Sequence, residues 1–261
     1  MRASKYHGLE DWDALADWYD NKQGDGGDLW HRALIDPTLV RVIGNCEGKV
    51  VLDLGCGNGY LSRVLARGGA RVTAVDSSPR MVKNAQARDP GNSLGIMYLV
   101  SDAGRLSAIG DEGFDVVFAN MSLMDIEDGE GAIREVSRVL KAGGRFVASI
   151  SHPCFDNGSN SGWLAEKSVL ESPKVFRKIR SYRIPFSEEI PWRVGEKERK
   201  YTRAFHRPLN WYARVLRSNG LSIVALEEPE PTKELLDKED PITAAGFQEV
   251  PLHLVIEAIK Q

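Results

Sequence analysis

Three glycines and two carboxylates near the start of the chain have the spacing of a site for a nucleotide-like ligand. Asp53 lies in an apolar run just before Gly55, Gly57 and Gly59, and Asp76 closes the next apolar run. Glycine lets a ligand approach the main chain without obstruction by Cβ atoms, and a helix that begins after the glycines directs N–H groups at the same point. An acid at the end of the second strand can accept hydrogen bonds from a ribose diol. The five residues therefore predict one βαβ cofactor site.

The elements that must position this site alternate between strand and helix. Apolar runs predict seven strands, at residues 50–54, 71–75, 96–100, 114–119, 145–150, 221–226 and 252–259. Helical spacing of apolar residues separates most of them, and a helical segment at residues 9–44 precedes them, in which Asp36-Pro37 predicts a helix start. We therefore expect an α/β fold with a Rossmann-like, doubly wound, mostly parallel sheet whose last strand is antiparallel.

Ligands of such sheets bind beyond the carboxyl ends of the strands. Polar residues follow those ends at Asp53, Asp76, Asp102, Asn120 and His152, so we expect them to converge on one edge of the sheet. The spacing G-x-G-x-G disfavours a nicotinamide-dependent dehydrogenase, whose fingerprint is G-x-G-x-x-G.

Three stretches together resemble the class I S-adenosylmethionine-dependent methyltransferases that act on small molecules. They are residues 51–59 (VLDLGCGNG), 114–120 (FDVVFAN) and 139–146 (VLKAGGRF), and the resemblance is strong over residues 49–151. It implies S-adenosylmethionine as methyl donor, with the glycine loop against its amino-acid end and ribose. It also implies a set of cofactor-binding positions, namely Tyr19, Asp53, Gly55, Cys56, Gly57, Asn58, Gly59, Asp76, Ser77, Met81, Asp102, Ala103 and Asn120.

The resemblance and the pattern of the chain together divide it into four parts, of which the insertion has no general counterpart in the family. Residues 1–48 are expected to form an N-terminal helical lid and residues 49–151 the cofactor-binding core. Residues 152–207 interrupt the strand-helix rhythm and are expected to form an insertion after the fifth strand that caps the substrate. Residues 208–261 would supply a helix and a strand pair that complete the sheet.

Charge and cysteine content limit the class of ligand and the cellular location that we expect. The net charge is −3, but residues 174–207 hold eleven Lys or Arg against four Glu. This basic stretch favours an anionic small molecule such as a carboxylate, and it leaves RNA as a disfavoured alternative. Three separate cysteines and the lack of an apolar leader or membrane-length run predict a cytoplasmic protein without a metal site.

Methyl transfer is an in-line displacement, in which positioning supplies much of the rate. A general base is needed only where the nucleophile arrives protonated, and His152 and His206 are the candidates. We expect Trp163, Phe176, Tyr182, Phe186 and Trp192 of the insertion to shape an apolar pocket, with Arg180, Arg183 and Arg203 on its rim. Tyr19, Trp18 and Trp30 are candidates for contact with a sulfonium cation.

A cofactor-binding protein without enzymatic activity is the alternative from another class. The sequence leaves open the acceptor atom (O, N, S or C), the pathway and the oligomeric state.

Overall fold

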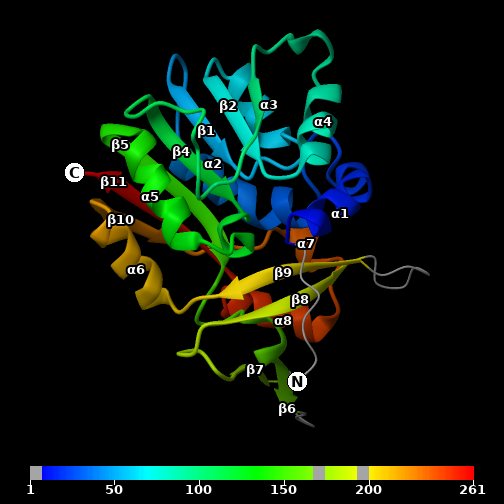
Figure 1. Cartoon of the computed structure of the whole chain (residues 1–261). Helices are drawn as coiled ribbons and strands as arrows, with labels where there is room; N and C mark the ends of the chain where they lie inside the picture. The colour runs from blue at the N-terminus through cyan, green and yellow to red at the C-terminus, as the bar shows by residue number, and fades with distance from the viewer. Residues whose placement is uncertain (1–7, 167–173, 193–199) are drawn as a thin grey trace.

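The computed structural model describes residues 8–166, 174–192 and 200–261 of the chain. At its centre is one sheet of seven strands in the order β10-β11-β5-β4-β1-β2-β3 (Figure 1). β11 is antiparallel to both of its neighbours, β5 and β10, whereas the other neighbouring pairs are parallel. The predicted fold class, with one antiparallel strand added last, is confirmed.

The strands of the sheet are β1 (Val50–Leu54), β2 (Arg71–Asp76), β3 (Met97–Val100), β4 (Phe114–Asn120), β5 (Leu140–Ser151), β10 (Leu221–Glu227) and β11 (His253–Lys260). The helices are α1 (Gly8–Gln23), α2 (Asp36–Ile43), α3 (Tyr60–Arg67), α4 (Pro79–Ala87), α5 (Gly129–Val139), α6 (Leu209–Ser218), α7 (Lys233–Leu236) and α8 (Pro241–Glu249). Short turns of 3₁₀ helix are η2 (Pro90–Asn92), η3 (Leu123–Asp125) and η4 (Gly158–Asn160).

Two hydrophobic cores cover the two faces of the sheet. Because side chains of a strand alternate between faces, Val51 belongs to one core and Leu52 to the other. The core around Leu52 contains apolar residues of α5 and α6, such as Val136 and Leu216, and the core around Val51 contains those of α2 and α3. This is the doubly wound arrangement in which the carboxyl ends of the parallel strands are left to bind ligands.

The N-terminal segment departs from the prediction at Asp36. α2 begins at Asp36, but a π-helical turn, η1 (His31–Ile35), runs directly into it, so Asp36 is not the predicted N-cap. Pro37 still occupies the first turn of α2, where its missing N–H costs little. The Asp36 carboxylate accepts hydrogen bonds from the Tyr60 hydroxyl at 2.9 and 3.0 Å instead of capping a helix.

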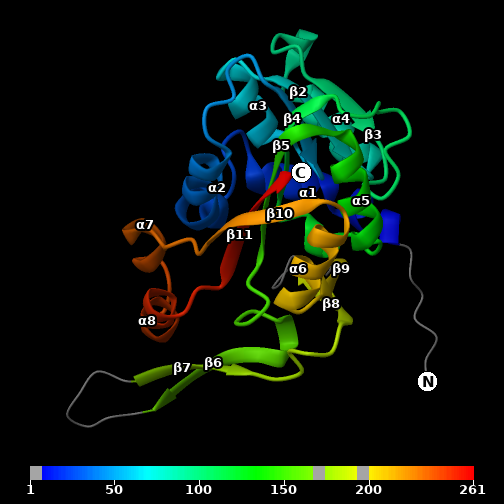
Figure 2. The same ribbon diagram turned by 90° about the vertical axis from the view of Figure 1, so that its left-hand side faces the viewer.

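The insertion contains two antiparallel hairpins. One pairs β6 (Ser161–Glu166) with β7 (Lys174–Ile179), and the other pairs β8 (Phe186–Trp192) with β9 (Lys200–His206). Both lie below the central sheet in the two perpendicular views (Figures 1 and 2). β9 contacts α1 and η3, so the N-terminal helix and the insertion meet at the end of the sheet. No helix among the described residues has the length and apolarity to cross a membrane.

Candidate functional site

The glycine loop between β1 and α3 is fixed by main-chain hydrogen bonds. The N–H groups of Gly55 and Cys56 both donate to the Val75 carbonyl, at 2.9 Å each. Gly55 has a φ of +80°, and a Cβ atom there would lie 2.5 Å from the Cβ of Ser122. Ser122 is held in place because its hydroxyl donates to the Leu54 carbonyl at 2.6 Å. The loop therefore has one conformation, and that conformation requires glycine at position 55.

Asp76 joins this loop to the second strand. Its Oδ2 accepts a hydrogen bond from the Gly57 N–H and its Oδ1 one from the Ser78 N–H, at 2.9 Å each. Burial raises the pKa of Asp76, and these main-chain donors oppose the shift. Each carboxylate oxygen has a second lone pair, so the group can still accept hydrogen bonds from a diol.

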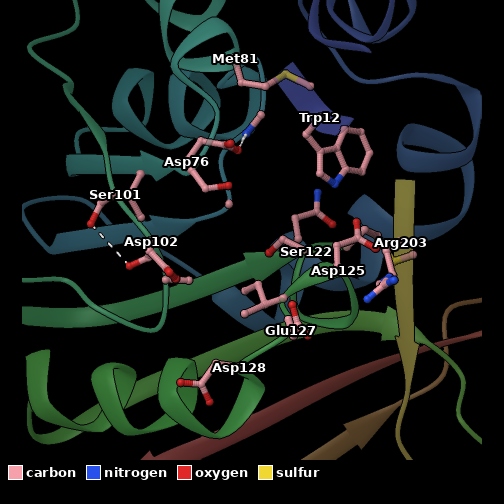
Figure 3. A pocket seen from close by; sticks show the side chains of 18 of the residues that line it. Trp12, Asp76, Met81, Ser101, Asp102, Ser122, Asp125, Glu127, Asp128 and Arg203 are labelled. Carbon is pink, nitrogen blue, oxygen red and sulfur yellow. Dashed lines mark hydrogen bonds between the residues drawn. The ribbon is translucent and has the colours of Figure 1, made fainter. Parts of the chain in front are cut away.

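A cavity of about 750 Å³ opens beside Asp76, at the carboxyl ends of β1, β2 and β4 (Figure 3). This volume lies within the range of small-molecule sites. α1 contributes Trp12 and Tyr19 to its wall, and β9 contributes Arg203 and Phe205. The cavity is thus bounded by the sheet, the N-terminal helix and the insertion together.

Nine of the predicted cofactor-binding residues line this cavity: Tyr19, Gly55, Gly57, Asp76, Ser77, Met81, Asp102, Ala103 and Asn120. Asp53, Cys56 and Asn58 instead line an adjoining space of about 30 Å³, which also touches Tyr19, Gly55, Gly57 and Asn120. Gly59 lines neither space. It is the N-cap of α3, and a Cβ atom at this position would lie 3.1 Å from the Tyr98 ring.

Asp53 and Asn58 are turned toward the interior. The Asp53 carboxylate accepts a hydrogen bond from the Ser62 hydroxyl at 2.6 Å, and burial raises its pKa to about 7, with Asp76 adding to the shift. The Asn58 amide donates to Asp20 Oδ1 at 3.1 Å and to the Gly24 carbonyl at 2.8 Å. Asn58 therefore fastens the glycine loop to the end of α1, and its amide points away from the larger cavity.

A polar network that sequence reasoning missed supports Asn120. The Asn120 amide donates to Asp36 Oδ1 at 3.1 Å and to the Tyr60 hydroxyl at 2.7 Å, and its oxygen accepts from the Ser149 hydroxyl at 2.7 Å. Burial raises the pKa of Asp36 despite its donors. Asp36 and Tyr60 are far from Asn120 in the sequence, so no local pattern could have connected them.

The two histidines predicted as bases lie outside the residues that line the cavity. His152 is buried, with Nε2 3.2 Å from Glu228 and Nδ1 accepting from the Cys154 N–H. His206 places Nε2 2.8 Å from the Tyr182 carbonyl. These positions give the predicted base roles no support, because each imidazole is engaged away from the cavity.

The insertion contributes fewer cavity residues than predicted. Of its expected rim, Arg203 lines the cavity, whereas Arg180 binds Asn160 in the β6–β7 region. Trp192 packs against Trp12 and Tyr19, with ring centroids 5.5 and 5.9 Å apart, and so supports the wall from behind. Trp163 and Phe186 pack elsewhere, against Phe247 and His206. Trp30 also packs on Phe247, away from the cavity.

The charge of the cavity wall is mainly negative. Five acids line it, and among the described residues in the wall Arg203 is the one cationic side chain (Figure 3). The acids are Asp76, Asp102, Asp125, Glu127 and Asp128. Such a wall favours a cation over an anion. The described residues contain no group of three or more His, Cys, Asp or Glu side chains arranged to hold a metal ion.

Comparisons with known proteins agree with this geometry. A family model for a methyltransferase domain matches residues 52–148. A ubiquinone biosynthesis O-methyltransferase of Xanthomonas axonopodis pv. citri (strain 306) is 35% identical over 153 residues, which are 57% of this chain and 63% of the relative. Its counterpart from Xanthomonas oryzae pv. oryzae (strain PXO99A) is 39% identical over 102 residues, 39% of this chain and 43% of the relative. The chain thus spans less than two thirds of the length of these curated relatives.

Solved structures match over a larger share. An S-adenosylmethionine-dependent methyltransferase from Mesorhizobium loti superimposes with a TM-score of 0.67 at 26% identity, covering 90% of this chain and 99% of that one. A putative S-adenosylmethionine-dependent methyltransferase from Listeria monocytogenes has the same TM-score and identity over 89% and 97%. Residues 52–148 therefore match a methyltransferase domain, and the chain has the fold of solved S-adenosylmethionine-dependent methyltransferases.

The residues present fit the methyl donor of these methyltransferases. The main chain at Gly55 and Gly57 forms part of the wall, so no side chain at these positions fills the space. Asp76 has acceptor capacity left for ribose hydroxyls, and Met81 and Ala103 offer apolar surface. The acidic wall suits a ligand that carries a sulfonium and an ammonium group.

Proposed function

We propose that this protein transfers a methyl group from S-adenosylmethionine to a small-molecule acceptor. The observation that carries the proposal is the cavity at the strand ends, whose wall is formed by the main chain of Gly55 and Gly57 and by Asp76. When bound there, the cofactor supplies an electrophilic methyl carbon. In this proposal the Asp76 carboxylate accepts hydrogen bonds from the ribose hydroxyls of the cofactor, and Met81 and Ala103 contact its adenine ring.

The chain's own residues position the reactants and exclude water. Trp12 and Tyr19 of α1 and Phe205 of β9 form the wall opposite the strand ends. Alignment of nucleophile and methyl carbon can account for about 7–11 kcal/mol of the barrier when both are well oriented. A wall built from two separate elements, α1 and β9, supports this role, because it holds the acceptor against the strand ends.

The charge of the cavity wall also indicates the charge of the methyl acceptor. The basic residues of the insertion predicted an anionic acceptor. In the described part of the wall, however, these basic residues contribute Arg203, whereas five acids line the same cavity. We therefore propose a neutral or cationic small molecule. The names of the curated relatives support small-molecule methylation as a class.

Binding and label transfer test this proposal. Calorimetry should detect binding of S-adenosylhomocysteine but not of NAD, and Asp76→Ala should weaken binding by about a hundredfold or more, since a charge-assisted pair of hydrogen bonds is lost. Asp237→Ala, which removes an exposed acid at the end of α7, is the matched control and should leave binding unchanged.

Methyl-labelled cofactor incubated with separated metabolite and RNA fractions then identifies the acceptor class. Label in the metabolite fraction is expected. Label in RNA, or binding of NAD alone, would overturn the proposal.

A further inference from the structure

Asp125 is a cavity acid that the sequence analysis did not single out. It ends η3, directly after β4, and its side chain lines the cavity next to Ser122 and Arg203 in the close-up view (Figure 3). The turn is closed by a hydrogen bond of 2.9 Å from the Asp125 N–H to the Ser122 carbonyl. Buried Leu123 anchors the turn in the core.

The loop that carries Asp125 is clamped by Arg207. The guanidinium of this buried residue donates to the Ile126 carbonyl at 2.6 Å and to the Glu127 carbonyl at 2.9 Å, and it also reaches the Leu123 carbonyl at 3.3 Å. Main-chain carbonyls on both sides of Asp125 are therefore held by one side chain. The position of the carboxyl group is fixed before any ligand binds.

The Asp125 carboxyl differs from three of the other four acids of the wall in its lack of hydrogen-bond partners, and it is more buried than the fourth, Glu127, which is exposed. Asp76, Asp102 and Asp128 each accept a main-chain hydrogen bond, from Gly57 and Ser78, from Gly104 and from Gly131 respectively. Across the described residues, no hydrogen bond or ion pair engages the side chain of Asp125. Asp125 is half-buried, and a carboxyl group partly removed from water without a partner is costly, which points to a ligand that supplies one.

We propose that Asp125 is the catalytic residue that binds the N–H or O–H group of the methyl acceptor and takes its proton. The acceptor is accordingly an amine or a hydroxyl compound that brings its proton into the cavity. This inference rests on the proposed function and adds the base that the two histidines do not supply.

The step balances with the carboxylate as base. The acceptor's lone pair forms the new bond to the methyl carbon, and the electron pair of the broken carbon–sulfur bond stays on sulfur. The acceptor's N–H or O–H bond breaks, and Asp125 leaves the step as a carboxylic acid that later returns the proton to water. Desolvation and the charge of Asp76 raise the pKa of Asp125 to about 8, so its carboxylate is a stronger base than an ordinary aspartate, and the fraction of Asp125 in the carboxylate form that can take a proton grows as pH rises toward 8.

Sinefungin provides a test that does not depend on knowing the acceptor. This analogue carries an ammonium group where the cofactor carries its methyl-sulfonium, so it places N–H donors where the acceptor would meet Asp125. Calorimetry should show that the wild-type protein binds sinefungin about tenfold or more tightly than S-adenosylhomocysteine, because a hydrogen bond to a charged group contributes about that much.

Asp125→Asn should reduce this preference to roughly threefold or less while the affinity for S-adenosylhomocysteine stays within about twofold of wild type. Asp237→Asn is the matched control, since it makes the same change at an exposed acid at the end of α7 that does not line the cavity, and it should keep the preference. A preference that survives in Asp125→Asn, is missing from wild type, or is lost equally in Asp237→Asn overturns the inference. Failure of the wild-type protein to bind S-adenosylhomocysteine would contradict the proposed function itself.

Discussion

At the scale of single residues, the site depends on one close approach between two loops. Gly55 after β1 and Ser122 after β4 are so close that a methyl group at position 55 would overlap the Ser122 side chain. Ser122 has no freedom to withdraw, because its hydroxyl is bound to the Leu54 carbonyl. The wall of the cavity therefore has a geometric requirement that can be tested separately from its chemistry.

Gly55→Ala should abolish binding of S-adenosylhomocysteine and lower the unfolding temperature. The substitution combines a left-handed φ, which costs a non-glycine residue about 1–2 kcal/mol, with the collision against Ser122. Gly48→Ala is the control, because Gly48 has a φ of +71° and open space around its Cβ position. Thermal unfolding and calorimetry should show a modest destabilisation with intact binding for Gly48→Ala. Equal behaviour of the two variants would contradict the role given to Ser122.

At the scale of elements, α1 is attached to the core through the start of α4. Asp13 Oδ1 accepts from the Ser78 hydroxyl at 2.7 Å and from the Arg80 N–H at 2.8 Å. Ser78 is also the N-cap of α4, since its oxygen accepts from the Met81 N–H. The Asp13 carboxylate therefore connects α1 to the N-cap of α4, two residues after Asp76. This connection holds α1 where its residues Trp12 and Tyr19 line the cavity.

Asp13→Ala should loosen α1 and weaken binding of S-adenosylhomocysteine severalfold. The lost hydrogen bonds at a helix start correspond to about 1 kcal/mol. Asp17→Ala is the control on the same helix, because the exposed pair of Asp17 with Arg80 is expected to contribute little. Hydrogen exchange of the α1 amides should rise in Asp13→Ala more than in Asp17→Ala. If Asp13→Ala and Asp17→Ala weakened binding equally, the position of α1 at the cavity would depend on its overall attachment and not on the hydrogen bonds of Asp13 to the N-cap of α4.

Elements also show what the sequence could and could not predict. Continuous apolar runs and glycine stops were sufficient to predict the seven strands of the central sheet, because burial on both faces of a parallel sheet leaves a local pattern. The Asp36–Asn120 contact and the unpartnered Asp125 depend on residues that are brought together only by folding. The sequence did hold one sign of Asp125, because it is an acid within the apolar stretch from Leu123 to Ile126 just past β4. The prediction of a base rested on the two histidines instead.

At the scale of the whole molecule, several carboxyl groups lie together at one edge of the sheet, where they are shielded from water. Asp53 has a pKa of about 7 and Asp125 a pKa of about 8, both above the ordinary value of 3.8 because of burial and the charge of Asp76. The folded protein therefore holds protons that the unfolded chain has already released. Asp28, whose pKa is lowered to about 2 beside His31, acts in the opposite direction, but only at acidic pH.

The free energy of unfolding should accordingly fall as pH rises from 7 to 8.5. A raised pKa means that stability is present at low pH and is lost as pH rises through the folded-state pKa, which for these two acids is about 7 and about 8. Their combined loss over this interval is on the order of 1–2 kcal/mol. His253, whose pKa is lowered to about 3 by burial, stays neutral in the folded protein across the interval. Urea unfolding at the two pH values should show this decline in wild type, a smaller one in Asp53→Asn and in Asp125→Asn, and an unchanged one in the exposed control Asp237→Asn. Equal declines in all four proteins would show that the buried carboxyls at the sheet edge are not protonated in the folded state.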